Sequence, residues 1–388
     1  MKLSRTVQPT LVAALASILA AFLILDRWIV TDLGVKSFGR VWPFYVNYGD
    51  FGFVRRGLVG TLLQATPFPG LFENAYHFAI TVQHLALLAL IGLTTVYFLR
   101  SKYDQGWLFK AAVFLSPAFI LQVAYTTGSL DVFILILAFL NIVLVRNVFL
   151  FSAVMFVGPF VHELFLFTAP AQFTAYLLRN DLQLLAQPGR SLRMLAPPVL
   201  ALSVSALIVI LFGVTSMPQA QYEAAMARLI PHAVGQMDLW SGYFEVGSSI
   251  EQNQRSLGFL AMHLLRHAGF LIVPVGYAAF VFALLVRNEP RWFQRLLLAA
   301  SAAAPFLIYV IATDFYRWVG LSASMSLLLL MAYGAQKPLQ LGKGPLIALL
   351  LFSLCAPFGG PVIQNPLPMH QFVLKKLGVT PPVSPAIN

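Results

Sequence analysis

Long apolar stretches separated by short polar segments recur along the whole chain. Each stretch is close to the roughly 20 residues that a helix needs to cross the hydrocarbon core of a bilayer. This pattern predicts spanning helices near residues 10–30, 76–99, 108–126, 130–146, 195–213, 268–286, 296–312, 316–334 and 345–358. We therefore expect an all-α fold, a polytopic transmembrane helical bundle of about 10–11 helices that forms one integral membrane domain over residues 1–388.

The 31 residues 148–178 do not fit the pattern of a single ordinary span. Gly158-Pro159 and then His162-Glu163 interrupt the apolar run. The segment can form one long tilted helix, or two short helices in a broken hairpin with His162-Glu163 at its tip. The distribution of charge between the loops distinguishes these two topologies.

The hairpin topology places 14 lysines and arginines with three acids on one side of the membrane, and 11 of each on the other. Cytoplasmic loops carry an excess of Lys and Arg, so the first side is the cytoplasm. A single span would invert everything after residue 178 and move a net charge of +6 outward, so the hairpin is favoured. The N-terminus is then cytoplasmic, and the C-terminus and the loops 31–75 and 214–267 are extracytoplasmic. We expect a bacterial inner membrane.

Composition agrees with a membrane protein, because 59% of the residues are hydrophobic and only 10% are charged. Soluble domains are about one quarter charged. The net charge of +11 would suggest a nucleic-acid partner in a soluble protein, but in a membrane protein it records loop orientation, and no nucleic-acid partner is expected. The single cysteine, Cys355, allows neither a disulfide framework nor a thiolate metal cluster.

The first outer loop contains the most distinctive polar segment, residues 48–60. Asp50 is followed there by the adjacent pair Arg55 and Arg56, among aromatic residues and glycines. A guanidinium pair can clasp phosphate oxygens in a bidentate manner, and Asp50 can serve as a base beside them. The alternative is an interfacial helix that begins near Phe51, with Asp50 as its cap and the arginines extended towards headgroups. We also expect amphipathic helices at the interface in both outer loops, including one over residues 251–266.

His162 and Glu163, at the tip of the hairpin, are a second pair of candidates. Each arm has about 13–15 residues, or roughly 20 Å of helix, so the tip lies within the membrane and the two side chains line a polar cavity. Ionisable groups at that depth often mark a functional path, although a pair satisfied by neighbouring helices is the alternative. A zinc-protease motif is absent because Leu166 stands at the second ligand position.

Arg317 belongs to a third polar segment, together with Asp314 and Tyr316. Asp314 and Arg317 are three residues apart and can pair on one helical turn, while helix capping by Asp314 is the alternative. Asp131, in a polar turn before a helix, is a weaker candidate because capping accounts for it.

The number of predicted helices, together with an acid in the first outer loop, resembles the GT-C class of membrane glycosyltransferases and the related bacterial polysaccharide polymerases. In that class a catalytic acid lies in the first outer loop, and the substrate is a sugar on a polyprenyl phosphate or diphosphate. Asp50 is the position that matches best, with Asp32 as the fallback, but Phe51 stands where the paired acid of the class is expected.

The resemblance implies that Asp50 takes the proton of the acceptor hydroxyl, with His162 and Glu163 positioning the acceptor or assisting proton transfer. Arg55, Arg56 and Arg317 would bind the phosphate of the leaving lipid. No cofactor is required, and a divalent metal is compatible with the sequence although no metal ligands are assigned. The implied partners are the lipid-linked sugar, membrane lipids and proteins of envelope-polysaccharide assembly. A transporter or flippase of lipid-linked sugar, or a non-catalytic assembly partner, is the alternative.

Overall fold

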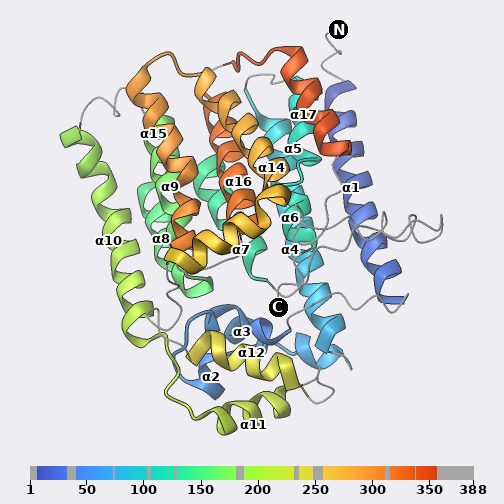
Figure 1. Ribbon diagram of the computed structural model, residues 1–388, viewed down its shortest axis with the longest axis vertical. Coiled ribbons are helices and arrows are strands. Elements are labelled where there is room, and N and C mark those ends of the chain that lie inside the picture. Colours follow the sequence, from blue (N-terminus) through green and yellow to red (C-terminus); the bar gives the residue numbers. More distant parts are fainter. Residues whose placement is uncertain are drawn as a thin grey trace.

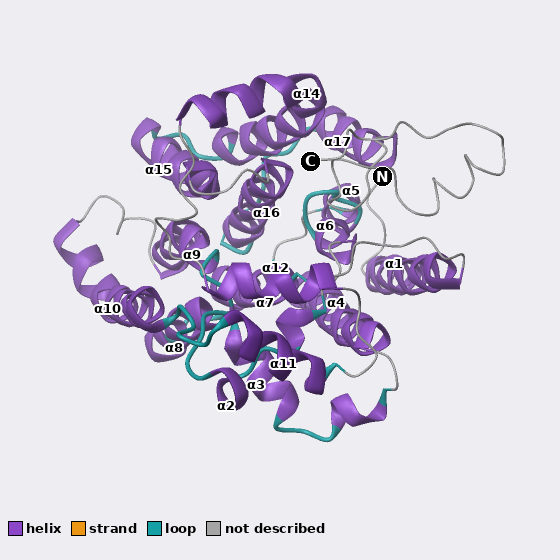
Figure 2. Cartoon of the chain, turned by 60° about the horizontal axis from the view of Figure 1, so that its bottom comes forward, coloured by secondary structure: helices purple, strands orange, loops and turns teal. Residues whose placement is uncertain are grey.

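The computed structural model describes residues 7–32, 41–72, 75–102, 106–125, 129–180, 188–230, 236–247, 257–310, 315–336 and 338–355. Regular secondary structure in these ranges is entirely helical (Figure 2). The unbroken helices of the bundle are α1 (Val7–Asp32), α4 (Ala75–Arg100), α10 (Pro188–Phe212), α14 (Leu257–Arg287), α16 (Phe315–Gly334) and α17 (Lys343–Cys355).

One other predicted span is divided into two helices, and two more continue in a different helix type part of the way along. These are α5 (Trp107–Phe114) with α6 (Ile120–Tyr125), α7 (Asp131–Phe139) with the π-helical turn Leu140–Leu144, and α15 (Trp292–Ala303) with the 3₁₀ segment Ala304–Val310. The expectation of one helix over 108–126 is therefore wrong. Pro117 explains the break, because proline has no N–H and disfavours helical geometry in the residue before it.

The broken hairpin is present as α8 (Val148–Val161) and α9 (Phe165–Asn180). His162 adopts extended backbone angles that end α8, and Asn147 caps the start of α8 by accepting hydrogen bonds from two backbone N–H groups. The two arms touch at Gly158, where a Cβ atom would lie 2.2 Å from the ring of Phe165. Glycine at this position therefore permits the close approach of the arms.

Three helical segments among the described residues are long and apolar enough to cross a membrane, namely Ala75–Arg100, Gly189–Phe212 and Trp292–Tyr309. Several shorter helices are also apolar, α8 among them. The outer surface of α10 exposes Leu192, Leu200 and Leu207, as expected of a helix that faces lipid.

A layer of short helices closes one end of the bundle (Figure 1). It consists of residues 41–72, 214–230 and 236–247, and we call it the loop layer. Its α-helices are α2 (Tyr48–Phe51), α3 (Gly57–Gln64), α11 (Gln219–Leu229) and α12 (Gln236–Gly247). The layer packs around a buried apolar cluster that it shares with Phe78 of α4, and its own residues in this cluster include Trp42, Phe44, Phe51, Tyr222 and Met226. The two loops expected on the same side of the membrane thus lie together.

The region after α12 differs from the expected structure. A separate amphipathic helix over 251–266 and a span over 268–286 were predicted, but α14 runs without interruption from Leu257 to Arg287. Residues 251–256 lie outside the described ranges. The apolar periodicity of the first part continues into the second without a helix breaker until Pro274, which α14 accommodates.

Candidate functional site

Arg56 lies at the start of α3, where the loop layer meets the hairpin. Its backbone has φ 63° and ψ 5°, and among the described residues it is the only non-glycine with positive φ. Such a conformation is unfavourable for a residue with a side chain and persists where surrounding contacts impose it. The preceding residue supplies one such contact, because the N–H of Arg55 donates to the carbonyl of Gly213 at 2.8 Å.

The guanidinium of Arg56 binds two carboxylates that come from distant parts of the chain. Its Nε donates to Oε1 and Oε2 of Glu163 at 3.1 and 3.0 Å, and its Nη2 also contacts Oε1. Its Nη1 donates to Oε2 of Glu245, near the end of α12. Burial alone would lower the pKa of Arg56, but the two carboxylates outweigh it and hold that pKa above its ordinary value. Arg56 therefore remains charged and joins the hairpin tip to the loop layer.

Arg55 binds a backbone carbonyl of the loop layer. Its Nε donates to the carbonyl oxygen of Glu245 at 2.6 Å, and its Nη2 contacts the same atom. The side chain is buried, and burial lowers the pKa of Arg55. Glu245 thus engages both arginines, one through its carboxylate and the other through its main chain.

His162 lies between Arg56 and a second ion pair. Its Nδ1 accepts a hydrogen bond from the N–H of Leu164 at 3.2 Å and lies 3.2 Å from Oε2 of Glu163. The ring also interacts electrostatically with Arg56 and with Asp131. The His162 ring therefore lies within electrostatic range of both charged groups.

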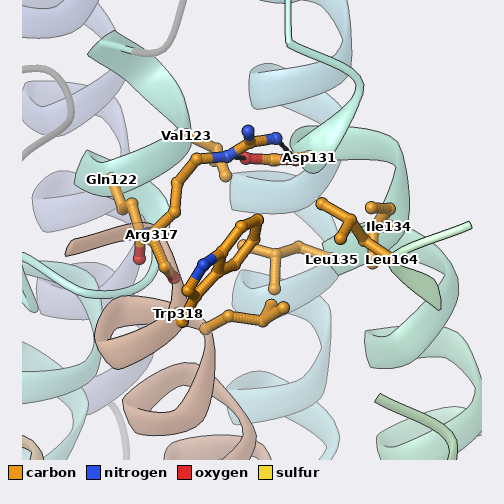
Figure 3. Close-up of a pocket in the computed structure, with 9 residues that line it drawn as sticks. Gln122, Val123, Asp131, Ile134, Leu135, Leu164, Arg317 and Trp318 are labelled. Carbon is orange, nitrogen blue, oxygen red and sulfur yellow. Dashed lines mark hydrogen bonds and ion pairs between the residues drawn. The ribbon is translucent and has the colours of Figure 1, made fainter. Parts of the chain in front are cut away.

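The second ion pair joins Arg317, in the first turn of α16, to Asp131, in the first turn of α7. Nε of Arg317 donates to Oδ2 at 2.7 Å, and Nη2 donates to Oδ1 at 2.6 Å and to the hydroxyl of Ser129 at 3.2 Å. Figure 3 shows the guanidinium directed at Asp131 above the ring of Trp318. A small cavity next to this pair is also lined by Leu164, which follows Glu163 at the hairpin tip. The two charged groups thus flank the tip.

The structure brings together several residues that the sequence treated separately. Arg56, His162 and Glu163 form one group, and Arg317 pairs with Asp131. Arg317 pairs over a long range with Asp131, while Asp314, its predicted local partner, lies outside the described residues.

Three further candidates remain. Asp50 is exposed in the single turn α2, whose cap is Asn47. The Asn47 side chain accepts from the N–H of Asp50 at 2.8 Å and donates to its carboxylate at 2.8 Å. Asp32 is the last residue of α1 and Tyr316 is in the first turn of α16, and both side chains lie outside the described part.

Glu245 is the residue of this site to which the sequence assigned no role. It lies 189 positions from Arg56, and neither a local motif nor helical periodicity links two residues so far apart. The fact that it is one of few acids in the second outer loop was the available signal.

No protein-family model, curated protein or solved structure matches this chain. Within the described ranges, no group of three or more His, Cys, Asp or Glu side chains is arranged to hold a metal ion. The chemistry of the site therefore has to be inferred from its own geometry.

Proposed function

We propose that this chain is a multi-pass protein of a bacterial inner membrane that transfers a sugar from a polyprenyl phosphate or diphosphate at the extracytoplasmic face. The observation that carries the proposal is the convergence of Arg56, Glu163 and Glu245, with Asp131 and Arg317 nearby, at the end of the bundle beneath the loop layer. Ionisable groups at such a position are costly to bury and commonly serve binding or catalysis.

The distribution of charge supports the proposed orientation. Arg100, Arg179 and Arg287 end α4, α9 and α14 at the end of the bundle opposite the loop layer (Figure 1). Positive residues at helix ends favour the cytoplasm, so the loop layer would face outward. The N-terminus would then be cytoplasmic and the C-terminus extracytoplasmic.

A groove on the side of the bundle suits the hydrocarbon part of such a substrate. It has a volume of about 570 Å³ and lies between α9, α10 and α15, with Phe173, Leu177, Leu195, Leu297 and Leu307 among its lining residues. Helix α10, and α15 together with the 3₁₀ segment after it, contain two of the three segments long enough to span a membrane, so the groove would open to the acyl chains.

In the proposed reaction the acceptor oxygen forms a bond to the anomeric carbon of the sugar, and the bond from that carbon to the phosphate oxygen breaks. The proton of the acceptor hydroxyl passes to a carboxylate, and the lipid phosphate leaves with the electron pair of the broken bond. Asp50 suits the role of base because it is exposed, and within the described residues its carboxylate pairs with no arginine. Glu163 and Asp131 are each held by an arginine, which favours their charged form and weakens them as bases.

Arginines beneath the loop layer would stabilise the charge that develops on the departing phosphate. Arg56 and Arg317 already bind carboxylates, and Arg55 binds a backbone carbonyl. A phosphate would therefore have to share or replace these partners. His162 and Glu163 would lie on the acceptor side of the same site.

The proposal is tested by sugar transfer in proteoliposomes with an Asp50→Asn variant. Loss of a general base lowers the rate by about 10²- to 10⁴-fold, while the amide preserves the hydrogen bond with Asn47. Glu223→Gln, on α11, where the carboxylate accepts a hydrogen bond from nearby Gln219 of the same helix, is the matched control and should transfer sugar normally. Near-normal transfer by the Asp50→Asn protein would remove Asp50 from catalysis.

A transporter of lipid-linked sugar is the second candidate, and one observation favours it. Glu289, between α14 and α15 at the opposite end of the bundle, is buried, and it accepts a hydrogen bond from the hydroxyl of Tyr333 at 3.0 Å. A transporter needs polar groups on both sides of the membrane. Transbilayer movement of lipid-linked sugar without any transfer would decide for this candidate.

A further inference from the structure

The two carboxylates bound to Arg56 are not equivalent. Glu163 contacts both Nε and Nη2, and it lies at the tip of a hairpin whose arms pack into the bundle. Glu245 contacts Nη1 alone through its side chain and lies near the end of α12, a 12-residue helix in the loop layer. Because Glu245 makes fewer of the contacts with Arg56, it is the partner that is easier to displace from Arg56.

The packing beneath α12 points in the same direction. A Cβ atom at Gly242 of α12 would lie 2.8 Å from the hydroxyl of Tyr222 and 3.1 Å from the ring of Trp42, so α12 rests directly on these two side chains. Both are fully buried, and within the described part neither the Tyr222 hydroxyl nor Nε1 of Trp42 has a hydrogen-bond partner. Buried donors without acceptors destabilise the arrangement that buries them.

Contacts at the end of α12 oppose this cost. They include the two contacts of Glu245 with the arginines and the hydrogen bond from the N–H of Thr215 to the carbonyl of Val246 at 3.0 Å. Arg55 and Arg56 therefore help to hold the end of α12 in place. An anion that competes for Arg56 would weaken this attachment.

A competing anion can reach this arginine. The side chains of Arg56 and Glu245 are 15% and 20% exposed, so their contact is not sealed from solvent. Carboxylate and phosphate oxygens accept the same hydrogen bonds from a guanidinium, and a phosphate presents more oxygens and more charge.

We propose that Glu245 is a built-in counter-anion that occupies the position at Arg56 where a phosphate oxygen of an isoprenyl phosphate binds. Binding of the phosphate displaces the Glu245 carboxylate and releases the end of α12 from the hairpin tip. This rests on the proposed function, since it assigns the phosphate of that substrate to Arg56. The contact between Glu245 and Arg56 is thereby an autoinhibitory latch.

The experiment measures binding of farnesyl phosphate, with farnesol as the uncharged analogue, to the full chain in nanodiscs. Glu245→Gln removes the competing charge but keeps the backbone oxygen that binds Arg55, so it should tighten farnesyl phosphate binding by about tenfold, equivalent to about 1.4 kcal/mol. Glu223→Gln, the matched control on α11, should leave affinity unchanged, and so should either variant with farnesol. Equal or weaker binding by the Glu245→Gln protein overturns the proposal.

A second measurement follows α12 directly. Val246→Cys, in a Cys355→Ser background that has no other cysteine, places a thiol at a buried position of α12. Farnesyl phosphate should raise its rate of labelling several-fold, and farnesol should not. An unchanged or reduced rate contradicts release of α12.

The outcomes separate this inference from the proposed function. If Arg56→Lys weakens farnesyl phosphate binding while Glu245→Gln has no effect, the phosphate site stands and the latch fails. If no variant binds farnesyl phosphate, the phosphate site fails as well. If inorganic phosphate competes as strongly as the lipid, the ligand is a free anion, and the lipid part of the proposal is overturned.

Discussion

Arg317 and Asp131, 186 positions apart in the chain, form a two-point ion pair in which Nε and Nη2 of the guanidinium each donate to one carboxylate oxygen. The side chains are only 16% and 13% exposed. Their geometry fixes the start of α16 against the start of α7, next to the hairpin tip.

This pair should show strong coupling between its members. Arg317→Met or Asp131→Leu alone leaves a largely buried charge without its partner and should destabilise the protein by up to about 3 kcal/mol. The double variant should be clearly more stable than the sum of the single losses predicts, because both charges are gone. Thermal unfolding in detergent of all four proteins measures this, and additive losses would show that the two side chains do not depend on each other.

Orientation in the membrane can be tested with a single thiol on each side. In a Cys355→Ser background, Ser216→Cys lies in the exposed start of the second outer loop, and Lys102→Cys lies at the opposite end of the bundle, after α4. An impermeant thiol reagent added to intact cells should label the first and not the second. Labelling of Lys102→Cys alone would reverse the topology and place the loop layer in the cytoplasm.

The contact of the hairpin arms gives a prediction for stability. Gly158→Ala puts a methyl group against the fully buried ring of Phe165, which has little room to move, and should destabilise the protein by about 1–3 kcal/mol. Gly276→Ala in α14 meets no atom within 4 Å and should be neutral or slightly stabilising. Thermal midpoints compare the two variants. Equal midpoints would mean that the arms can separate without cost.

Much of the fold could be predicted from local pattern, because apolar runs of spanning length and the interruption at His162-Glu163 are visible in the sequence. The break at Pro117 also had its signal, since proline disfavours a continuous helix there. The continuity of α14 had no such signal in the sequence. An amphipathic segment and an apolar one are equally helical, and only tertiary structure decides whether they form one helix.

The site was predictable in its parts but not in its connections. Arg56 and Glu163 stood out as unusual charges in apolar surroundings, which is a property of the local sequence. Their pairing, and the pairing of Arg317 with Asp131, depend on contacts across more than 100 positions. Helical spacing gives no information at that range.

The separation of Arg56 from its two partners along the chain also sets an order of assembly during synthesis. Glu163 follows Arg56 by 107 positions and Glu245 by 189. At about 5–20 residues per second, a ribosome needs roughly 10–40 s to progress from Arg56 to Glu245. The hairpin is therefore available to neutralise Arg56 while α12 is still unmade, and the loop layer is completed only after most of the earlier helices have left the ribosome.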